Sequence, residues 1–191
     1  TGGALNLIST PIPKVFSGRT NLSIGQNNAR NLQAYLGDAY PNFAWLVETY
    51  QANVDGYKKL DSGDNTGFDK KDYLAKFRLN TDREGDLYQE ILVKVGQTDE
   101  TSHETYLGLT DQDFSTAPYR RYAGSQVDRM ETNQEQYQVR YFIQPGETFD
   151  LTSIAYRSNF KRNWYKLDRV RAAAGGTRSL IGNILNSPGA H

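Results

Sequence analysis

The sequence predicts an all-β protein, an antiparallel up-and-down meander of about seven long strands. Apolar and polar residues alternate along runs of about ten residues, and polar or turn-forming segments separate these runs. The chain holds 13 Tyr and 8 Phe among 191 residues, yet only 37% of its residues are hydrophobic. Such a composition is poor for a helical bundle and favours strands, in which aromatic side chains are enriched.

The first three strands are predicted from short alternating runs. Residues 20–24 and 31–36 flank a polar turn at residues 25–28 and predict a tight hairpin. Gly, Asp, Pro and Asn then form a connection, after which Phe43, Trp45 and Val47 share one parity. We expect this third strand to end near residue 51.

The fourth and fifth strands have the clearest alternation. They cover residues 73–80 and 87–95, with a short turn between them and a long polar connection before them. Residues 97–132 then show no sustained period and predict an elaborate loop. Within it, residues 110–113 resemble a capped helical turn that ends at residues 117–118.

The sixth and seventh strands form a hairpin within residues 133–166. Pro145 and Gly146 occupy the second and third places of residues 144–147, which suits a type II turn. The seventh strand is ambiguous in parity, and we place Leu151 and Ala155 on its apolar side. A loop is expected from residue 161, with one short helix around residues 180–185.

Strand length and connection length together predict a transmembrane sheet. Runs of about ten residues match a tilted membrane-crossing strand. Short turns follow the second, fourth and sixth strands, long loops follow the third, fifth and seventh, and only the tight first hairpin departs from this pattern. A Lys or Arg on the apolar parity near the midplane costs about 2–4 kcal/mol. Arg157 shares the parity of Leu151 and Ala155. Other charged residues avoid the apolar parity, namely Lys76, Arg78, Glu90, Lys94 and Arg140. The residues predicted to face lipid are Tyr73, Phe77, Leu79, Ile91, Val93, Tyr137, Val139 and Tyr141.

Composition excludes several other classes of protein. Lys plus Arg equals Asp plus Glu at 22 each, so the net charge does not favour a nucleic-acid partner. Cysteine is absent, which rules out disulfides and thiolate sites. No apolar run approaches the length of a transmembrane helix. The sequence also shows no nucleophile with a base, no P-loop and no dinucleotide motif, so we predict no enzyme and no cofactor.

Several motifs resemble the TonB-dependent outer-membrane receptors, and within them the branch similar to the ferric citrate receptor. Residues 1–13 read TGGALNLISTPIP, which is similar to the end of the plug domain of that family. The other motifs are GYKKLD at 56–61 with TGF at 66–68, ETYLGLTDQDF at 104–114, PYRRYAGSQ at 118–126 and RNWYKLD at 162–168.

This resemblance implies a plugged barrel of about 22 strands, of which the chain is a fragment. Residues 1–13 would end the plug and cross to the barrel. Residues 14–160 would form barrel strands one to seven with outer loops at 54–70 and 97–132, and residues 161–191 would begin a long outer loop. The implied activity is active uptake of a ferric chelate of citrate or siderophore type. The implied partners are outer-membrane lipid of a bacterial cell and an inner-membrane energy-coupling protein that acts through the plug.

Loop position and chemistry select the candidate ligand-binding residues. Arginine forks bind carboxylates bidentately, so arginines at the loop end suit an anionic ferric chelate, although solvated loop arginines would look the same in sequence. The candidates are Arg120, Arg121, Tyr122 and Arg162.

We predict no metal site. Asp61, Asp64, Asn65 and Asp69 form an oxygen-rich loop that lacks the twelfth-position Glu of an EF-hand. His103 is the only internal histidine and has no partner of suitable spacing.

A second interpretation of the same alternation is a soluble β-sandwich module that binds a glycan or a protein. It differs from the first in one structural expectation. The sandwich would bury Tyr73, Phe77, Tyr137 and Tyr141 between two sheets, whereas the receptor would leave them on an outer surface.

Overall fold

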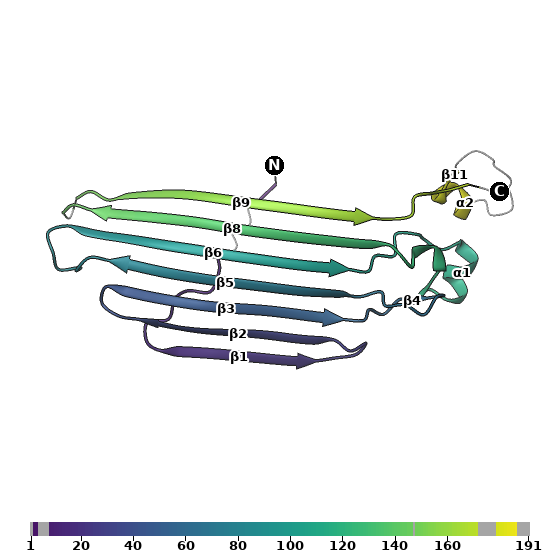
Figure 1. The fold of residues 1–191 in the computed structure, drawn as a ribbon, viewed down its shortest axis with the longest axis horizontal. Helices are drawn as coiled ribbons and strands as arrows, with labels where there is room; N and C mark the ends of the chain where they lie inside the picture. Colours follow the sequence, from purple (N-terminus) through teal and green to yellow (C-terminus); the bar gives the residue numbers. More distant parts are fainter. Residues whose placement is uncertain (1, 4–7, 147, 172–178, 187–191) are drawn as a thin grey trace.

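One antiparallel sheet of seven strands dominates the structure (Figure 1). The computed structural model describes residues 2–3, 8–146, 148–171 and 179–186. The strands pair in chain order, which confirms the predicted all-β meander. They are β1 (Ser17–Ile24), β2 (Arg30–Ala39), β3 (Phe43–Val54), β5 (Phe68–Asn80), β6 (Tyr88–Ser102), β8 (Arg129–Gln144) and β9 (Leu151–Tyr165).

The remaining elements are short and lie at the loop end of the sheet (Figure 1). They are β4 (Lys59–Leu60), α1 (Asp111–Thr116), β7 (Arg120–Arg121), the 3-10 turn η1 (Ala123–Ser125), β10 (Arg169–Val170), β11 (Ser179–Leu180) and α2 (Ile181–Asn186). Thr110 caps α1 through its side chain, which accepts a hydrogen bond from the Asp113 amide at 3.2 Å. Both predicted helical turns are therefore present. Neither described helix has the length and apolar character needed to cross a membrane.

The connections differ in length at the two ends of the sheet, as predicted. Residues 40–42, 81–87 and 145–150 connect strands at one end, while residues 25–29, 55–67 and 103–128 connect them at the other (Figure 1). Gly146 has a φ of +94°, the left-handed conformation that the third place of a type II turn requires. The hairpin itself is wider than the predicted turn, because β9 begins only at Leu151, and residue 147 lies outside the described residues.

The long strands extend further toward the loops than predicted. β6 continues to Ser102 and β8 begins at Arg129, so the predicted loop 97–132 shortens to residues 103–128. β5 begins at Phe68, and β9 continues to Tyr165 rather than ending at residue 160. Most side chains of these ends are polar on both faces, so the ends lack the alternation by which a strand is recognised in sequence.

The strand register separates the two faces of the sheet. All eight residues predicted to face lipid share one face, together with Leu151 and Ala155, and we call it the apolar face. One row across it reads Trp45, Phe77, Val93, Val139 and Ala155. Nearer the loops, a row on the same face reads Gln51, Lys71, Asp99, Asn133 and Lys161. In β3, β5, β6 and β8 the apolar side chains of this face are thus confined to the turn half, whereas in β1 and β2 Leu22, Ile24 and Leu32 continue the apolar surface to the loop end.

The opposite face, which we call the polar face, carries the charged residues in the turn half of β5, β6 and β8. They are Lys76, Arg78, Glu90, Lys94 and Arg140. Two other charged residues of the turn half, Asp38 and Arg157, lie on the apolar face. Arg140 forms an ion pair with Glu90, which is 9% exposed. Neutralising a poorly hydrated carboxylate in this way offsets part of its desolvation cost.

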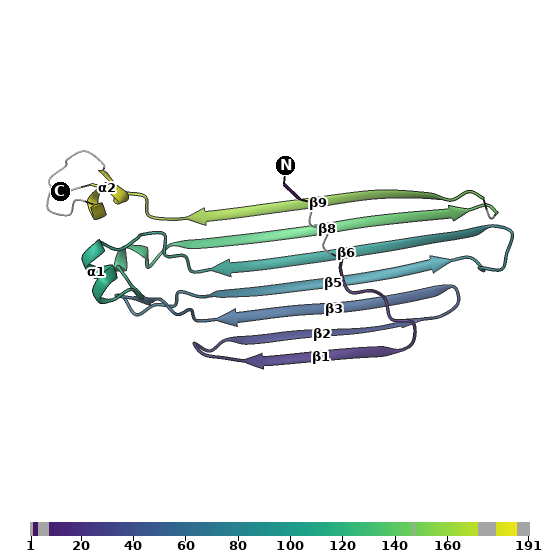
Figure 2. The ribbon, with the colours of Figure 1, turned by 180° about the vertical axis from the view of Figure 1, so that it is seen from behind.

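The N-terminal segment, residues 8–13, crosses the polar face and we call it the strap (Figure 2). The Lys76 ammonium donates to the carbonyl oxygens of Ser9 at 3.2 Å and Thr10 at 2.6 Å. At the other edge of the crossing, a Cβ on Gly37 would come within 2.7 Å of the Pro13 ring, so glycine is required there. Leu46 lies between Gly37 and Lys76 in the register and is fully buried. The strap therefore covers a row of the polar face.

The aromatic residues that distinguish the two sequence interpretations are not covered by a second sheet. Tyr73, Phe77 and Tyr137 are 45%, 43% and 45% exposed. The other described sheets have only two strands each and lie in the loop region. The burial expected for a β-sandwich is therefore not found in the described part of the chain.

We expect Lys76→Met to release the strap, because the carbonyl groups of Ser9 and Thr10 lose their donor. A hydrogen bond from a charged group contributes about 1.5–3 kcal/mol, so proteolytic cleavage within residues 8–16 should become at least tenfold faster. Lys94→Met is the matched control, since Lys94 pairs with Lys76 in the register and makes no hydrogen bond with the described strap residues. Equal cleavage rates in the two variants would contradict the assignment.

Candidate functional site

The candidate site lies in the loop cluster, which we define as residues 55–67, 103–128 and 162–168. Two of these loops are joined by a short parallel pairing of β4 with β7. The amide of Lys59 donates to the Tyr119 carbonyl at 2.7 Å, and that of Asp61 donates to the Arg121 carbonyl at 2.9 Å. Tyr57 and Tyr119 meet edge to face with ring centroids 5.9 Å apart. The loops after β3 and β6 therefore form one folded unit.

Arg120 links this unit through its guanidinium group. Its Nε and Nη2 donate to the two carboxylate oxygens of Asp61 at 2.9 and 3.0 Å, and its Nη1 donates to Asp113 at 3.2 Å. The guanidinium carbon also lies 5.2 Å from the ring centroid of Tyr122, whose hydroxyl donates to Asp113. Two carboxylates thus neutralise Arg120, and we call this arrangement the arginine clasp.

The clasp perturbs the acidity of Asp61. The hydrogen bonds from Arg120 lower the pKa of the Asp61 carboxyl below its usual 3.8, more than partial burial raises it. The same pairing raises the pKa of Arg120. Of the four predicted ligand-binding residues, Arg120 and Tyr122 contact each other, because the Arg120 guanidinium lies over the Tyr122 ring.

The other two predicted residues have different surroundings. Arg121 turns back on its own loop, where Nη1 donates to the carbonyl oxygens of Pro118 at 2.9 Å and of Arg120. Arg162 is exposed and lies over Trp164, with 5.5 Å between the guanidinium carbon and the ring centroid. No ion pair with a described carboxylate engages Arg121 or Arg162.

Asp128 connects the loop after β6 to the end of β9. Its carboxylate is 1% exposed and accepts from the amide of Tyr106 at 3.1 Å and from that of Leu167 at 2.8 Å. Beside it, a Cβ on Gly124 would lie 3.1 Å from Leu167 and 3.3 Å from Leu107, so the backbone approaches these side chains closely. Asp128 therefore holds three of the sequence motifs together. Sequence reasoning missed it, because an Asp in a polar loop gives no periodic signal.

Trp164, Tyr106 and Lys166 form a second cluster beside Asp128. The Trp164 and Tyr106 rings meet edge to face at a centroid distance of 6.1 Å. The Lys166 ammonium lies 3.8 Å from the Tyr106 centroid and 4.4 Å from the Trp164 centroid, as in a cation–π contact. Lys166 was not among the predicted site residues.

The oxygen-rich loop does not assemble ligands around a cation. Asp61 is engaged by Arg120, and the side-chain oxygen of Asn65 accepts from the Gly67 amide at 2.6 Å. Within the described residues, no group of three or more His, Cys, Asp or Glu side chains is arranged to hold a metal ion.

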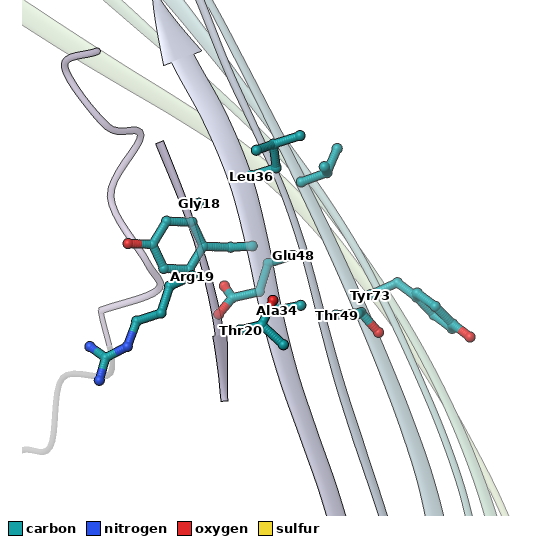
Figure 3. Close-up of a pocket in the computed structure, with 10 residues that line it drawn as sticks. Gly18, Arg19, Thr20, Ala34, Leu36, Glu48, Thr49 and Tyr73 are labelled. Carbon is teal, nitrogen blue, oxygen red and sulfur yellow. The ribbon is translucent and has the colours of Figure 1, made fainter. Parts of the chain in front are cut away.

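A separate hollow of about 600 Å³ lies on the sheet rather than among the loops (Figure 3). Gly18, Thr20 and Ala34 leave space on the apolar face between the larger Leu36 and Tyr73. Arg19 also borders it but points away from Thr49 and Tyr73 (Figure 3). Because no charged groups converge there, this hollow offers no site for an anionic ligand.

Comparison with known proteins does not identify the chain. No family model, no curated protein and no solved structure matches it.

The pH dependence of the clasp follows from the lowered pKa of Asp61. The pairing contributes stability above the unfolded pKa, and this contribution is lost only as the pH falls through the still lower folded value. We expect hydrogen-exchange protection of the Lys59 and Asp61 amides, corrected for intrinsic rates, to persist from pH 7 to pH 3.8 and to fall below it. Asp61→Asn should weaken this protection about two- to fivefold at pH 7, while Asp64→Asn, an exposed change in the same loop, should not. Loss of protection already near pH 6 would contradict this account.

Proposed function

We propose that the chain is part of a TonB-dependent outer-membrane receptor for active uptake of a ferric chelate, of citrate or siderophore type. The observation that carries this proposal is the distribution of side chains over the two faces. In the turn half of β5, β6 and β8, the charged residues lie on the polar face and most aromatic and aliphatic residues lie on the apolar face. In lipid, this arrangement keeps the charges away from hydrocarbon.

The change of polarity along the strands supports the same orientation. The apolar residues from Tyr137 to Ile143 span seven positions, or roughly 24 Å at about 3.4 Å per residue. At a tilt of about 35–45° this length covers roughly 17–20 Å along the membrane normal, which is most of the outward apolar band of a membrane barrel, about 25 Å tall. The polar half of β3, β5, β6 and β8 and the loop cluster would then stand outside the membrane, where a ligand arrives.

The edges of the sheet and the strap supply further support. β1 and β9 each pair with one strand only, and long open edges are aggregation-prone in water and unsatisfied in lipid. Additional strands that close the sheet would remove both problems. The strap crosses the polar face, which would be the inner side of such a barrel, as expected for a segment leaving an internal plug. An inner-membrane energy-coupling protein acting through that plug would drive release of the ligand.

A charge on the apolar face tests the membrane orientation. We expect Val139→Lys to lower the free energy of unfolding by about 2–4 kcal/mol in phospholipid vesicles, because the ammonium is placed against hydrocarbon. Gln136→Lys adds the same charge on the opposite face, where its cross-strand partner is Gly96, and should change it by less than about 0.5 kcal/mol. The measurement is denaturant unfolding of the full-length protein. Similar losses in both variants would contradict the orientation.

Ligand binding tests the function itself. We expect the full-length protein in detergent micelles to bind a ferric chelate saturably, measured by titration calorimetry with ferric citrate and with a neutral ferric trihydroxamate. Binding of an anionic chelate should weaken as salt is raised, because loop cations contribute to it. Failure to bind any ferric chelate would contradict the proposal.

A further inference from the structure

The loop end of β9 carries two cations around one aromatic ring. Arg162 and Trp164 lie two residues apart in β9 and so share a face, and Lys166, one residue beyond the strand, contacts the same Trp164 ring. The Arg162 guanidinium carbon lies 5.5 Å from the Trp164 centroid and the Lys166 ammonium lies 4.4 Å from it. The Arg162 guanidinium carbon and the Lys166 ammonium therefore lie no further apart than the sum of these two distances. We call this arrangement the tryptophan clamp.

Both charges of the clamp lack a carboxylate partner within the described residues. Ion pairs occupy Lys70, Lys71, Arg120, Arg129 and Arg140 there, but neither Arg162 nor Lys166. Two neighbouring carboxylates are already engaged, since Asp128 accepts two backbone amides and Glu131 pairs with Arg129 at 2.6 Å. An incoming anion would therefore not have to break an ion pair, as it would at Arg120.

The clamp is also held in position before any ligand arrives. Asp128 fixes the amide of Leu167, next to Lys166, and the amide of Tyr106, whose ring contacts the same ammonium. Holding flexible cations in place in advance reduces the ordering cost of binding. Tyr106 and Trp164 remain 51% and 41% exposed, so a ligand can reach both rings.

We propose that Arg162 and Lys166, held on Trp164 and Tyr106, bind a small polyanion that carries carboxylate groups. The guanidinium fork binds one carboxylate in a bidentate manner, and the ammonium binds a second as a point charge. The flat rings between them pack against the carbon skeleton of the ligand. The site is inferred from its geometry alone. Only the identification of the ligand as the ferric complex of a polycarboxylate rests on the proposed function.

The test is titration calorimetry of the full-length protein with ferric citrate, iron-free citrate and inorganic phosphate. We expect Arg162→Gln and Lys166→Gln each to weaken binding of the citrate ligands at least tenfold, as for loss of a hydrogen bond from a charged group. Lys161→Gln is the matched control, because it removes the same charge from the opposite face of β9, and it should change affinity less than twofold. Hydrogen exchange of the Leu167 amide in each variant verifies that the loop remains folded.

The outcomes separate this inference from the proposed function. If the wild-type protein binds ferric citrate and the two clamp variants bind it equally well, the clamp is overturned and the proposed function stands. If only iron-free citrate binds, and the clamp variants lose it, the clamp stands and ferric uptake is contradicted. Binding of phosphate in preference to citrate, or of neither citrate ligand, overturns the clamp as a polycarboxylate site.

Discussion

The antiparallel register is the constraint on which the rest of the structure depends. Each backbone hydrogen-bond ladder aligns one residue per strand, so a row of seven side chains lies on the same face of the sheet. A shift of one residue in any strand would move its charged side chains onto the apolar face. Gln89 shows how the register accommodates a polar exception, because its side-chain oxygen accepts the Tyr141 hydroxyl on that face at 2.6 Å.

In the loop cluster, the placement of carboxylates decides what each cation does. Arg120 meets two carboxylates and becomes a structural link between loops. Arg162 and Lys166 meet aromatic rings instead, which orient a cation without cancelling its charge. Asp128 makes this difference possible, because its carboxylate accepts hydrogen bonds from backbone amides and forms no ion pair with a nearby cation of the described residues. Residues of the same chemical type therefore serve different purposes a short distance apart.

The strap shows how one buried cation organises the polar face. Lys76 is 8% exposed and would be costly there without partners, and the two carbonyl oxygens of the strap supply them. The contact joins a segment that precedes the sheet to a strand in its middle. Leu46 is fully buried beneath the crossing, next to Lys76 on the same face. A single residue thus couples the path of the N-terminal segment to the register of β5.

The sequence alone determined the fold class, the order of the strands and the face that carries most apolar side chains of β5, β6 and β8. Alternation at a period of two residues is a local property, and it survives wherever one face is apolar, as from Tyr73 to Leu79. Tertiary structure decided the ends of the strands, because from Gln97 to Ser102 both faces are polar and pairing with β5 and β8 extends the strand. It also decided the roles of Arg120, Asp128 and Lys166. Their partners lie far away in the chain and meet only when the loops fold together, so no local pattern identifies them.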